Sequence, residues 1–291
     1  MKAAEATRGV RLLVLTTAIG AMGALLSVLG SDVLAQVPAV RFDVRAAKGL
    51  EVSPVYEGWY EVDGRKYALF GYSNRNLEEV VDIPLGPNNS VAPGPADQRQ
   101  PTRFFPGVHK GVFAAALPSD QPTTVVTWTL SANGQTASIP VNLSPFYVVS
   151  ALRETGTAYP GNTPPIVKVD PTGASAQGPH GIFASRTATV GRPLTLDVSV
   201  TDDGLPSGDR GVTGKHQPLA LHWQVYRGAG AARFSDPRPA IARDQARTTV
   251  TFSEPGSYVL HLQAVDSMTI NRCCWTNGYV TVTVEEDADR R

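Results

Sequence analysis

The only two cysteines of the 291-residue chain, Cys273 and Cys274, are adjacent, and Trp275 follows them. Two thiols in an oxidising compartment tend to pair, so we expect a vicinal disulfide. Such a bond closes a very small ring and adds almost nothing to global stability, because the entropic gain grows with loop length. We therefore expect a local effect, a rigid turn that presents Trp275 at a loop tip. An intermolecular disulfide with a second copy is the alternative. Zinc is disfavoured because adjacent thiolates diverge and no third ligand is near in sequence.

Three aspartates form a second candidate site. Asp202 and Asp203 follow one predicted strand, and Asp266 follows another. In a β-sandwich these two loops fall at the same end, and clustered carboxylates suit calcium, which takes about six to eight oxygen ligands. The favoured alternative is that the aspartates bond backbone N–H groups of their own turns, because an evenly spaced D-x-D-x-D-G loop is missing. Calcium is the one cofactor that the sequence suggests.

Polar and aromatic side chains share one face of three predicted strands near the C-terminus. If the strands are neighbours, His222 and His261 lie close enough to share a metal ion. Two histidines leave a zinc shell half empty, so an ordinary solvated face is the simpler interpretation. Such a face is also a candidate surface for an extracellular protein or polysaccharide. The predicted binding residues are Trp275, Tyr226, Tyr279, His222 and His261, with Gln224, Gln263 and Thr281 beside them on the same face.

Enzyme signatures are absent from the sequence. There is no G-x-S-x-G elbow, no H-E-x-x-H helix, no phosphate-binding glycine loop and no Cys-x-x-Cys pair. None of the five histidines has a carboxylate or cysteine neighbour at a catalytic spacing. The sequence therefore predicts a non-enzymatic protein, with an enzyme whose site lies between two domains as the less favoured alternative. The 26 basic residues are balanced by 26 acidic ones, which argues against a nucleic-acid partner.

The first 35 residues have the pattern of an export signal. Basic residues precede the uncharged stretch Leu12–Gly30, and Val33-Leu34-Ala35 fits a signal-peptidase site. The apolar stretch is long, so an uncleaved membrane anchor is the competing interpretation. Its many Gly, Ala and Thr residues favour cleavage. We expect a secreted, periplasmic or cell-surface protein that contacts the membrane only if the signal is retained.

The rest of the chain reads as β-structure. Period-two alternation recurs between clusters of Gly, Pro, Asn and Asp, and no stretch has helical periodicity. Asp63-Gly64 and Asn133-Gly134 have the composition of two-residue hairpin turns. The proline-rich loop 86–107 cannot enter a central strand ladder. We predict an all-β fold with two tandem β-sandwich domains preceded by a signal helix. The predicted boundaries are 1–35 (signal), 36–158, a Pro/Gly linker 159–165, 166–286 and a charged tail 287–291.

The second predicted domain contains an ordered series of motifs: VGRPLTL at 190–196, VTDDGLP at 200–206, LHWQV at 221–225, TVTFSEPGSYVL at 249–260, AVD at 264–266 and YVTVTV at 279–284. This series resembles the polycystic-kidney-disease-type (PKD-like) immunoglobulin-like repeats of bacterial secreted proteins, over about residues 164–286. The resemblance implies a sandwich of about seven strands and a role in display or adhesion. The chain departs from the pattern in a longer, more polar connection at 207–217 and in an expanded loop at 267–278 that holds the cysteines.

Alternation in the same region predicts which side chains are buried. Trp223 is the expected central core aromatic, and Tyr258 follows the Pro255-Gly256 turn where a tyrosine corner would lie. The other inward positions are Leu194, Leu196, Val198, Val200, Leu219, Leu221, Val225, Leu260, Leu262, Ala264, Val280, Val282 and Val284.

These observations together predict an exported, non-enzymatic interaction, adhesion or surface-structural protein. The alternative is a carbohydrate-binding accessory module of a secreted hydrolase system, because β faces that carry aromatic side chains stack on sugar rings.

Overall fold

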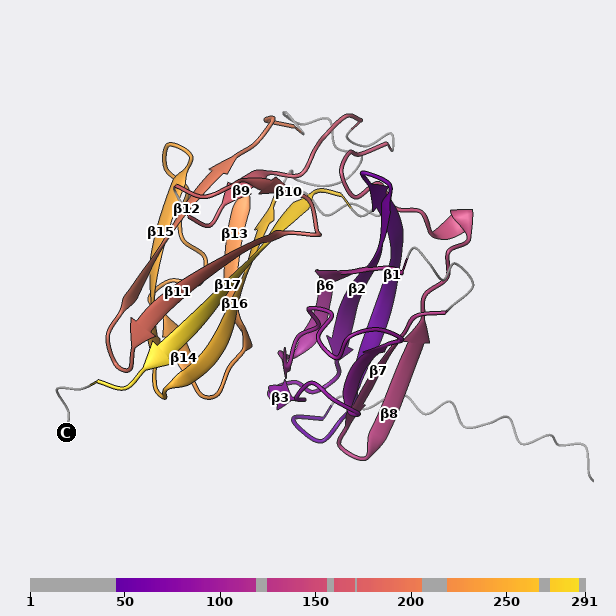
Figure 1. The fold of residues 1–291 in the computed structure, drawn as a ribbon, viewed down its shortest axis with the longest axis horizontal. Coiled ribbons are helices and arrows are strands. Elements are labelled where there is room, and N and C mark those ends of the chain that lie inside the picture. Colours follow the sequence, from indigo (N-terminus) through magenta and orange to yellow (C-terminus); the bar gives the residue numbers. More distant parts are fainter. Residues whose placement is uncertain are drawn as a thin grey trace, which may run out of the picture. The chain divides into compact units, whose positions relative to one another are not determined.

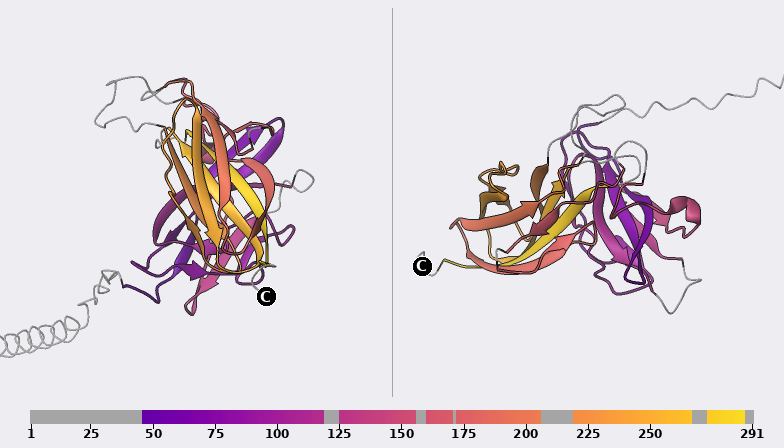
Figure 2. Two further views of the ribbon diagram at one scale, coloured as in Figure 1. Left: turned by 90° about the vertical axis from the view of Figure 1, so that its left-hand side faces the viewer. Right: turned by 90° about the horizontal axis from the view of Figure 1, so that it is seen from above.

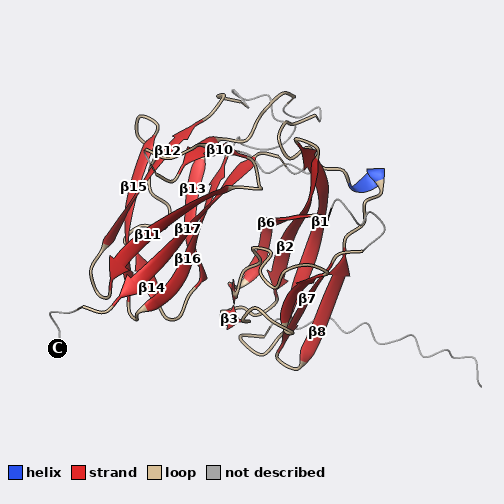
Figure 3. Ribbon diagram, in the orientation of Figure 1, coloured by secondary structure: helices blue, strands red, loops and turns tan. Residues whose placement is uncertain are grey.

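The computed structural model describes residues 46–118, 125–155, 160–170, 172–205, 219–266 and 273–287. Apart from one short 3-10 helix, the regular elements of these residues are all β-strands (Figure 3), so the fold is all-β as predicted. Across these ranges no helix combines the length and the apolar character needed to cross a membrane. The predicted signal, residues 1–35, lies outside the described residues. Residues 45–291 form one compact unit.

The first half, residues 46–155, contains two three-stranded antiparallel sheets and a two-stranded ribbon. The sheets have the orders β1-β2-β6 and β4-β7-β8, and β3 pairs with β5. Strands β1, β2, β6, β7 and β8 can be followed in Figure 1. Its elements are β1 (Val52–Val62), β2 (Arg65–Asn74), β3 (Val81–Asp82), β4 (Asn89–Ala92), β5 (Arg103–Phe104), β6 (Gly107–Ala116), β7 (Thr127–Ala132), β8 (Gln135–Pro140) and the 3-10 helix η1 (Pro145–Tyr147).

Aromatic side chains fill the core of the first half. The Trp128 ring of β7 contacts the rings of Phe70 and Phe113 edge-on, with centroids 5.5 and 5.0 Å apart. Both predicted hairpin turns are present, because Asp63-Gly64 and Asn133-Gly134 have the positive φ angles that a two-residue hairpin requires.

A buried amide holds the proline-rich loop 86–107 in place. Asn89 Nδ2 donates to the carbonyl oxygens of Ile83 at 2.9 Å and Pro101 at 2.6 Å, while Asn89 Oδ1 accepts from Trp128 Nε1 at 3.2 Å. As predicted, the loop stays out of a central ladder: its strand β4 pairs only with β7, and β5 pairs only with β3. Side-chain hydrogen bonds therefore replace the ladder bonds that prolines cannot donate.

The second half, residues 160–287, is an immunoglobulin-like β-sandwich. Its two sheets have the orders β10-β9-β12-β15-β14 and β11-β17-β16-β13, and β11 pairs parallel with β17 (Figures 1 and 2). The strand order β9-β12-β15-β14 in one sheet corresponds to the ABED sheet of immunoglobulin domains, and the order β13-β16-β17 in the other corresponds to their CFG sheet. The elements are β9 (Ile166–Lys168), β10 (Ala176–Gln177), β11 (Ile182–Thr189), β12 (Leu194–Thr201), β13 (Ala220–Arg227), β14 (Ala232–Phe234), β15 (Gln245–Phe252), β16 (Gly256–Val265) and β17 (Trp275–Glu285).

The predicted core of the second half is confirmed. Trp223, Leu260 and Val282 are buried between the two sheets with most of the other predicted inward positions. Tyr258 forms the expected tyrosine corner, because its hydroxyl donates to the carbonyl oxygen of Glu254 at 2.9 Å. Leu194 and Leu219 at the strand ends are only partly buried.

The proline-rich segment between the two halves is packed against its neighbours. Pro164 and Pro165 are buried, and their carbonyl oxygens accept hydrogen bonds from Gln177 Nε2 and Thr276 Oγ1. The segment thus contacts strands β10 and β17 on its way into β9.

Candidate functional site

A bulge in strand β6 presents backbone carbonyl groups to the second half. Between the pairs Phe70–Phe113 and Tyr72–His109, residues 110–112 of β6 lie opposite the single residue Gly71. The buried carboxylate of Glu57 fills this bulge and accepts a hydrogen bond from Gly111 N at 3.0 Å. Gly71 is required here, because a Cβ at this position would overlap Glu57 Oε1. The bulge therefore has a defined shape before anything packs on it.

Four side chains of β16 and β17 donate hydrogen bonds to the three carbonyl oxygens of this bulge. Trp275 Nε1 and Asn277 Nδ2 donate to Gly111 O at 3.1 and 2.9 Å. Gln263 Nε2 donates to Lys110 O at 3.1 Å, and Tyr279 Oη donates to Val112 O at 2.8 Å. Burial raises the pKa of the Tyr279 hydroxyl above its usual range, so the hydroxyl remains a donor at neutral pH.

Residues 97–102 of the proline-rich loop make a second set of contacts with β13. Tyr226 Oη donates to Arg99 O at 2.6 Å, and the Arg227 guanidinium forms a two-pronged ion pair with Asp97 at 2.7 and 2.9 Å. Arg227 Nε also donates to Gln100 O at 3.0 Å. We call these two sets of contacts together the junction. It consists of the bulge 110–112 packed on β16 and β17 and of the loop 97–102 packed on β13.

The junction covers the sheet face on which the sequence places a binding surface. Tyr226, Tyr279 and His261 are buried, and His222 is half-buried. The prediction of a solvent-facing polar and aromatic surface is therefore wrong for Tyr226, Tyr279 and His261, whereas His222 lines an open pocket of about 370 Å³ on this face. Alternation shows only that the two faces of a strand differ in polarity, and here backbone carbonyl groups of β6 satisfy the polar face.

His261 has both ring nitrogens occupied. Nδ1 lies 3.0 Å from Gln224 Nε2, which can only donate, and Nε2 lies 3.1 Å from Asn277 Oδ1. The ring is thus a neutral imidazole with its proton on Nε2. Burial, with a smaller contribution from His222 and His109, lowers the pKa of His261 to about 4. This arrangement leaves no lone pair on His261 for a metal ion shared with His222.

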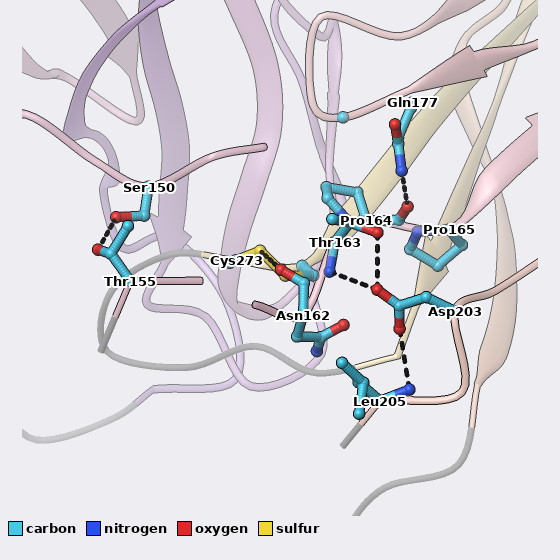
Figure 4. Close-up of a disulfide and its surroundings, with 12 residues drawn as sticks. Ser150, Thr155, Asn162, Thr163, Pro164, Pro165, Gln177, Asp203, Leu205 and Cys273 are labelled. Carbon is cyan, nitrogen blue, oxygen red and sulfur yellow. Dashed lines mark hydrogen bonds between the residues drawn. A yellow bond between two sulfur atoms is a disulfide. The ribbon is translucent and has the colours of Figure 1, made fainter. Parts of the chain in front are cut away.

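Cys273 and Cys274 form a vicinal disulfide. Both are fully buried, and their sulfur atoms lie 3.8 and 3.4 Å from the carbonyl oxygen of Asn162 in the linker (Figure 4). The prediction that Trp275 stands at an exposed loop tip is wrong, because its ring is fully buried against Gly111. The disulfide and Trp275 are parts of the interior, so neither is available to a ligand.

The three aspartates do come together. Carboxylate oxygens of Asp202, Asp203 and Asp266 lie within 4.8 Å of one another. Asp203 accepts hydrogen bonds from Thr163 N at 2.9 Å and Leu205 N at 2.8 Å, so it joins its own turn to the linker (Figure 4). Asp202 accepts from Gly204 N at 3.0 Å. These bonds match the turn-stabilising interpretation. The donor set, three carboxylates in one cluster, also suits a hard cation, so calcium stays a prediction.

An open cleft of about 940 Å³ lies at the end of the β1–β2 hairpin. Its walls come from the hairpin turn at Asp63, from the loop 93–99 and from the last residues of β6. Its charged and aromatic lining residues are Asp63, Arg65, Lys66, Tyr67, Asp97 and Arg99. Sequence reasoning did not find this cleft, because its residues come from two loops and a hairpin that are distant along the chain.

An exposed apolar turn lies at η1. The side chains of Phe146, Tyr147 and Val148 are 97%, 46% and 53% exposed. The turn is nonetheless fixed, because Val148 N donates to Pro145 O at 3.2 Å and Trp59 Nε1 donates to Ser144 O at 3.1 Å.

Gly111 and Arg227 are junction residues that the sequence analysis missed. Gly111 lies inside strand β6, and a glycine inside a strand often marks a bulge or a close backbone approach, so the sequence carried a usable signal for it. Arg227 follows an alternating strand and carries no comparable signal.

No family model and no curated protein matches the chain. Among solved structures, a nucleoside hydrolase-related hypothetical protein from Saccharophagus degradans is 19% identical, with a TM-score of 0.30 over 43% of this chain and 26% of that one. The PKD domain from KIAA 1837 protein is 21% identical, with a TM-score of 0.24 over 41% of this chain and 95% of its own length. The D00-D0 domain of intimin is 12% identical, with a TM-score of 0.25 over 80% and 100%. This chain thus spans about a quarter of the Saccharophagus protein, and likenesses at these TM-scores add nothing about function.

Proposed function

We propose that this chain is an exported, non-enzymatic interaction protein of the adhesion or surface-structural kind, with its second half a PKD-like module. The observation that carries the proposal is the rigid apolar turn at Phe146–Val148. Three consecutive apolar side chains held in a fixed turn and exposed to solvent are costly for a soluble protein, and such patches mark interaction sites. The partner that suits them is an extracellular protein with an apolar pocket.

The distribution of reactive side chains supports a role without catalysis. In the described ranges, no serine or threonine hydroxyl is hydrogen-bonded to a histidine, and both cysteines are joined in a disulfide. The buried histidine His261 and tyrosines Tyr226 and Tyr279 are engaged in the junction. A broad hydrolase screen should therefore give no turnover. Turnover that disappears on replacement of one polar residue would overturn this part of the proposal.

The apolar turn provides the direct test. Phe146→Ser should weaken binding of the purified protein to cell-surface preparations by at least about tenfold, because a central aromatic anchor contributes about 2 kcal/mol or more. Its melting temperature should not change, since Phe146 is almost fully exposed. Leu77→Ser is the matched control, because Leu77 is 52% exposed in another part of the first half. Equal binding by wild type and Phe146→Ser would contradict the proposed surface.

The carbohydrate-binding alternative is favoured by a separate observation. The open cleft beside the β1–β2 hairpin combines an aromatic side chain, Tyr67, with several charged groups. Both features occur in sites that recognise polysaccharides.

A further inference from the structure

Three cationic side chains line the open cleft, and each lies over an aromatic ring. The Arg99 guanidinium carbon is 4.0 Å from the centroid of Phe183, and Lys66 Nζ is 5.0 Å from that of Trp59. The Arg65 guanidinium carbon is 5.8 Å from the centroid of Tyr67. Contacts of this kind hold a cation in place while leaving its N–H donors free for another partner.

The rings that carry these cations are themselves fixed. Phe183 stacks on the buried Tyr279 of the junction with centroids 5.0 Å apart, and Tyr67 stacks on the buried Tyr60 at 5.5 Å. Trp59 is held by its hydrogen bond to Ser144 O. The arrangement of the three positive charges is therefore set before any ligand binds, which reduces the entropic cost of binding.

The positive charge of the cleft is not neutralised from within. Asp97 also lines it, but the two-pronged ion pair with Arg227 satisfies its carboxylate, and that hydrogen bond holds the pKa of Asp97 below its usual value. Across the described ranges, none of the three cleft cations takes part in an ion pair. Among the lining residues that the structure describes, only Asp63 remains to oppose three positive charges.

We propose that this cleft binds an anionic polysaccharide, with Arg65, Lys66 and Arg99 contacting its acidic groups and Pro93 and Pro95 packing against a sugar ring. The inference rests on the proposed role as an extracellular interaction protein, and it gives that role a second ligand class at a site separate from Phe146. Guanidinium groups suit both carboxylates and sulfate esters.

The cleft's shape and lining favour a sugar polymer over an acidic peptide. Pro93 and Pro95 provide rigid apolar surfaces beside the charges. A peptide would be expected to use main-chain hydrogen bonds to a free sheet edge, whereas the cleft is walled by a hairpin turn and a loop. Its volume of about 940 Å³ is at the upper end of the usual range for a ligand site, and it is open at the surface.

The test is a set of binding titrations with the full mature chain at low salt. The probes are polygalacturonate (carboxylated), dextran sulfate (sulfated), neutral dextran and poly-glutamate. We expect polygalacturonate or dextran sulfate to bind at least about tenfold more tightly than neutral dextran and poly-glutamate. Raising the salt concentration to 0.5 M should weaken this binding, because exposed charges are then screened. Comparison of the first two probes distinguishes carboxylate from sulfate as the acidic group.

Substitutions locate the binding in the cleft. Arg99→Gln, Arg65→Gln and Lys66→Gln should each weaken binding by about tenfold, since each removes one charge-assisted contact. Arg233→Gln is the matched control, because Arg233 is an exposed arginine on strand β14.

Any one of the following results would overturn the inference: equal binding of poly-glutamate, equal binding of neutral dextran, or wild-type binding by the Arg99→Gln and Arg65→Gln variants. The absence of binding to any probe would also overturn it. Since Phe146 lies outside this cleft, the cell-surface assay with Phe146→Ser tests the proposed function independently of these outcomes.

Discussion

Both faces of the sheet β11-β17-β16-β13 pack against other parts of the molecule, but by different means, and the outer face is covered only in part. Its inner face presents Trp223, Leu260 and Val282 to the other sheet of the sandwich, where burial of apolar surface supplies the stabilisation. Its outer face presents Gln263, Asn277 and other polar side chains that donate to the carbonyl groups of β6. The packing of the inner face thus depends on how well apolar side chains fill the space between the sheets. The packing of the outer face depends on the geometry of its hydrogen bonds. Polarity of a strand face does not by itself indicate exposure.

The largest effect is expected on the inner face. Trp223→Ala should lower the free energy of unfolding by about 3–5 kcal/mol, because it leaves a large cavity between the sheets. Thr281→Ala on the exposed surface of β17 is the control and should change this free energy by less than about 0.5 kcal/mol. Urea denaturation measures both. Similar values for the two variants would mean that the sandwich core is not where the structure places it.

Acid should lower the free energy of unfolding through the buried His261 on the outer face of this sheet. The pKa of His261 is about 4 in the folded protein against an ordinary value of 6.5, so the folded state binds fewer protons than the unfolded state below pH 6.5. The contribution of neutral His261 to the free energy of unfolding is fully present above about pH 6.5. It is lost as the pH falls toward 4, by about 3 kcal/mol in total. His222 and His109, whose pKa values burial also lowers, add to this loss.

Denaturation curves at several pH values between 4 and 8 measure the loss. His261→Gln keeps hydrogen-bonding capacity without the titration and should flatten the curve over this interval. A wild-type stability that is independent of pH between 4 and 7 would contradict the buried position of His261.

A methyl group at position 111 should push the bulge of β6 away from Trp275 and so destabilise the junction. Gly111 has a φ of +59°, and a Cβ there would overlap the Trp275 ring, so Gly111→Ala should cost about 2 kcal/mol. Gly134→Ala is the matched control, because Gly134 also has a positive φ but has open space around it. It should cost only about 1 kcal/mol, the strain of an alanine at a positive φ without any overlap. Equal costs would show that the Trp275 contact contributes little.

Calcium should have the smallest effect. If Asp202, Asp203 and Asp266 bind the ion with a millimolar Kd, about 10 mM calcium stabilises the fold by about 1.4 kcal/mol, or about 3 °C in Tm. Asp266→Asn should remove the shift, and magnesium at the same concentration should give less of it. An unchanged wild-type Tm in calcium would leave only the turn-stabilising role.

The interior of the second half was predictable from sequence because period-two alternation and burial coincide there. The burial of Trp223 could be predicted from the alternation of its own strand. The tyrosine corner at Tyr258 could be predicted from its strand and from the Pro255-Gly256 turn before it. The hairpin at Asn133-Gly134 was predictable for the same reason, since the required φ angles depend on those two residues alone.

The junction and the cleft were not predictable, because their geometry depends on residues far apart in the chain. Trp275 meets Gly111, and Arg227 meets Asp97, across more than 120 residues of sequence. The bulge that aims the carbonyl groups depends on Glu57 and Gly71, neither of which has a distinctive local pattern. A polar side chain in an alternating strand therefore fits solvent and a buried carbonyl acceptor equally well.

The buried disulfide makes reduction a measure of local opening. A thiolate must reach one of the two sulfur atoms in line to break the bond, yet both are covered once Asn162 and Trp275 are in place. The rate of reduction by a small thiol should then be set by how often the segment around Cys273 and Cys274 opens. This rate should reach a plateau as the reductant concentration rises. The same cover implies that an oxidant must act on the chain before the two halves close over the sulfurs.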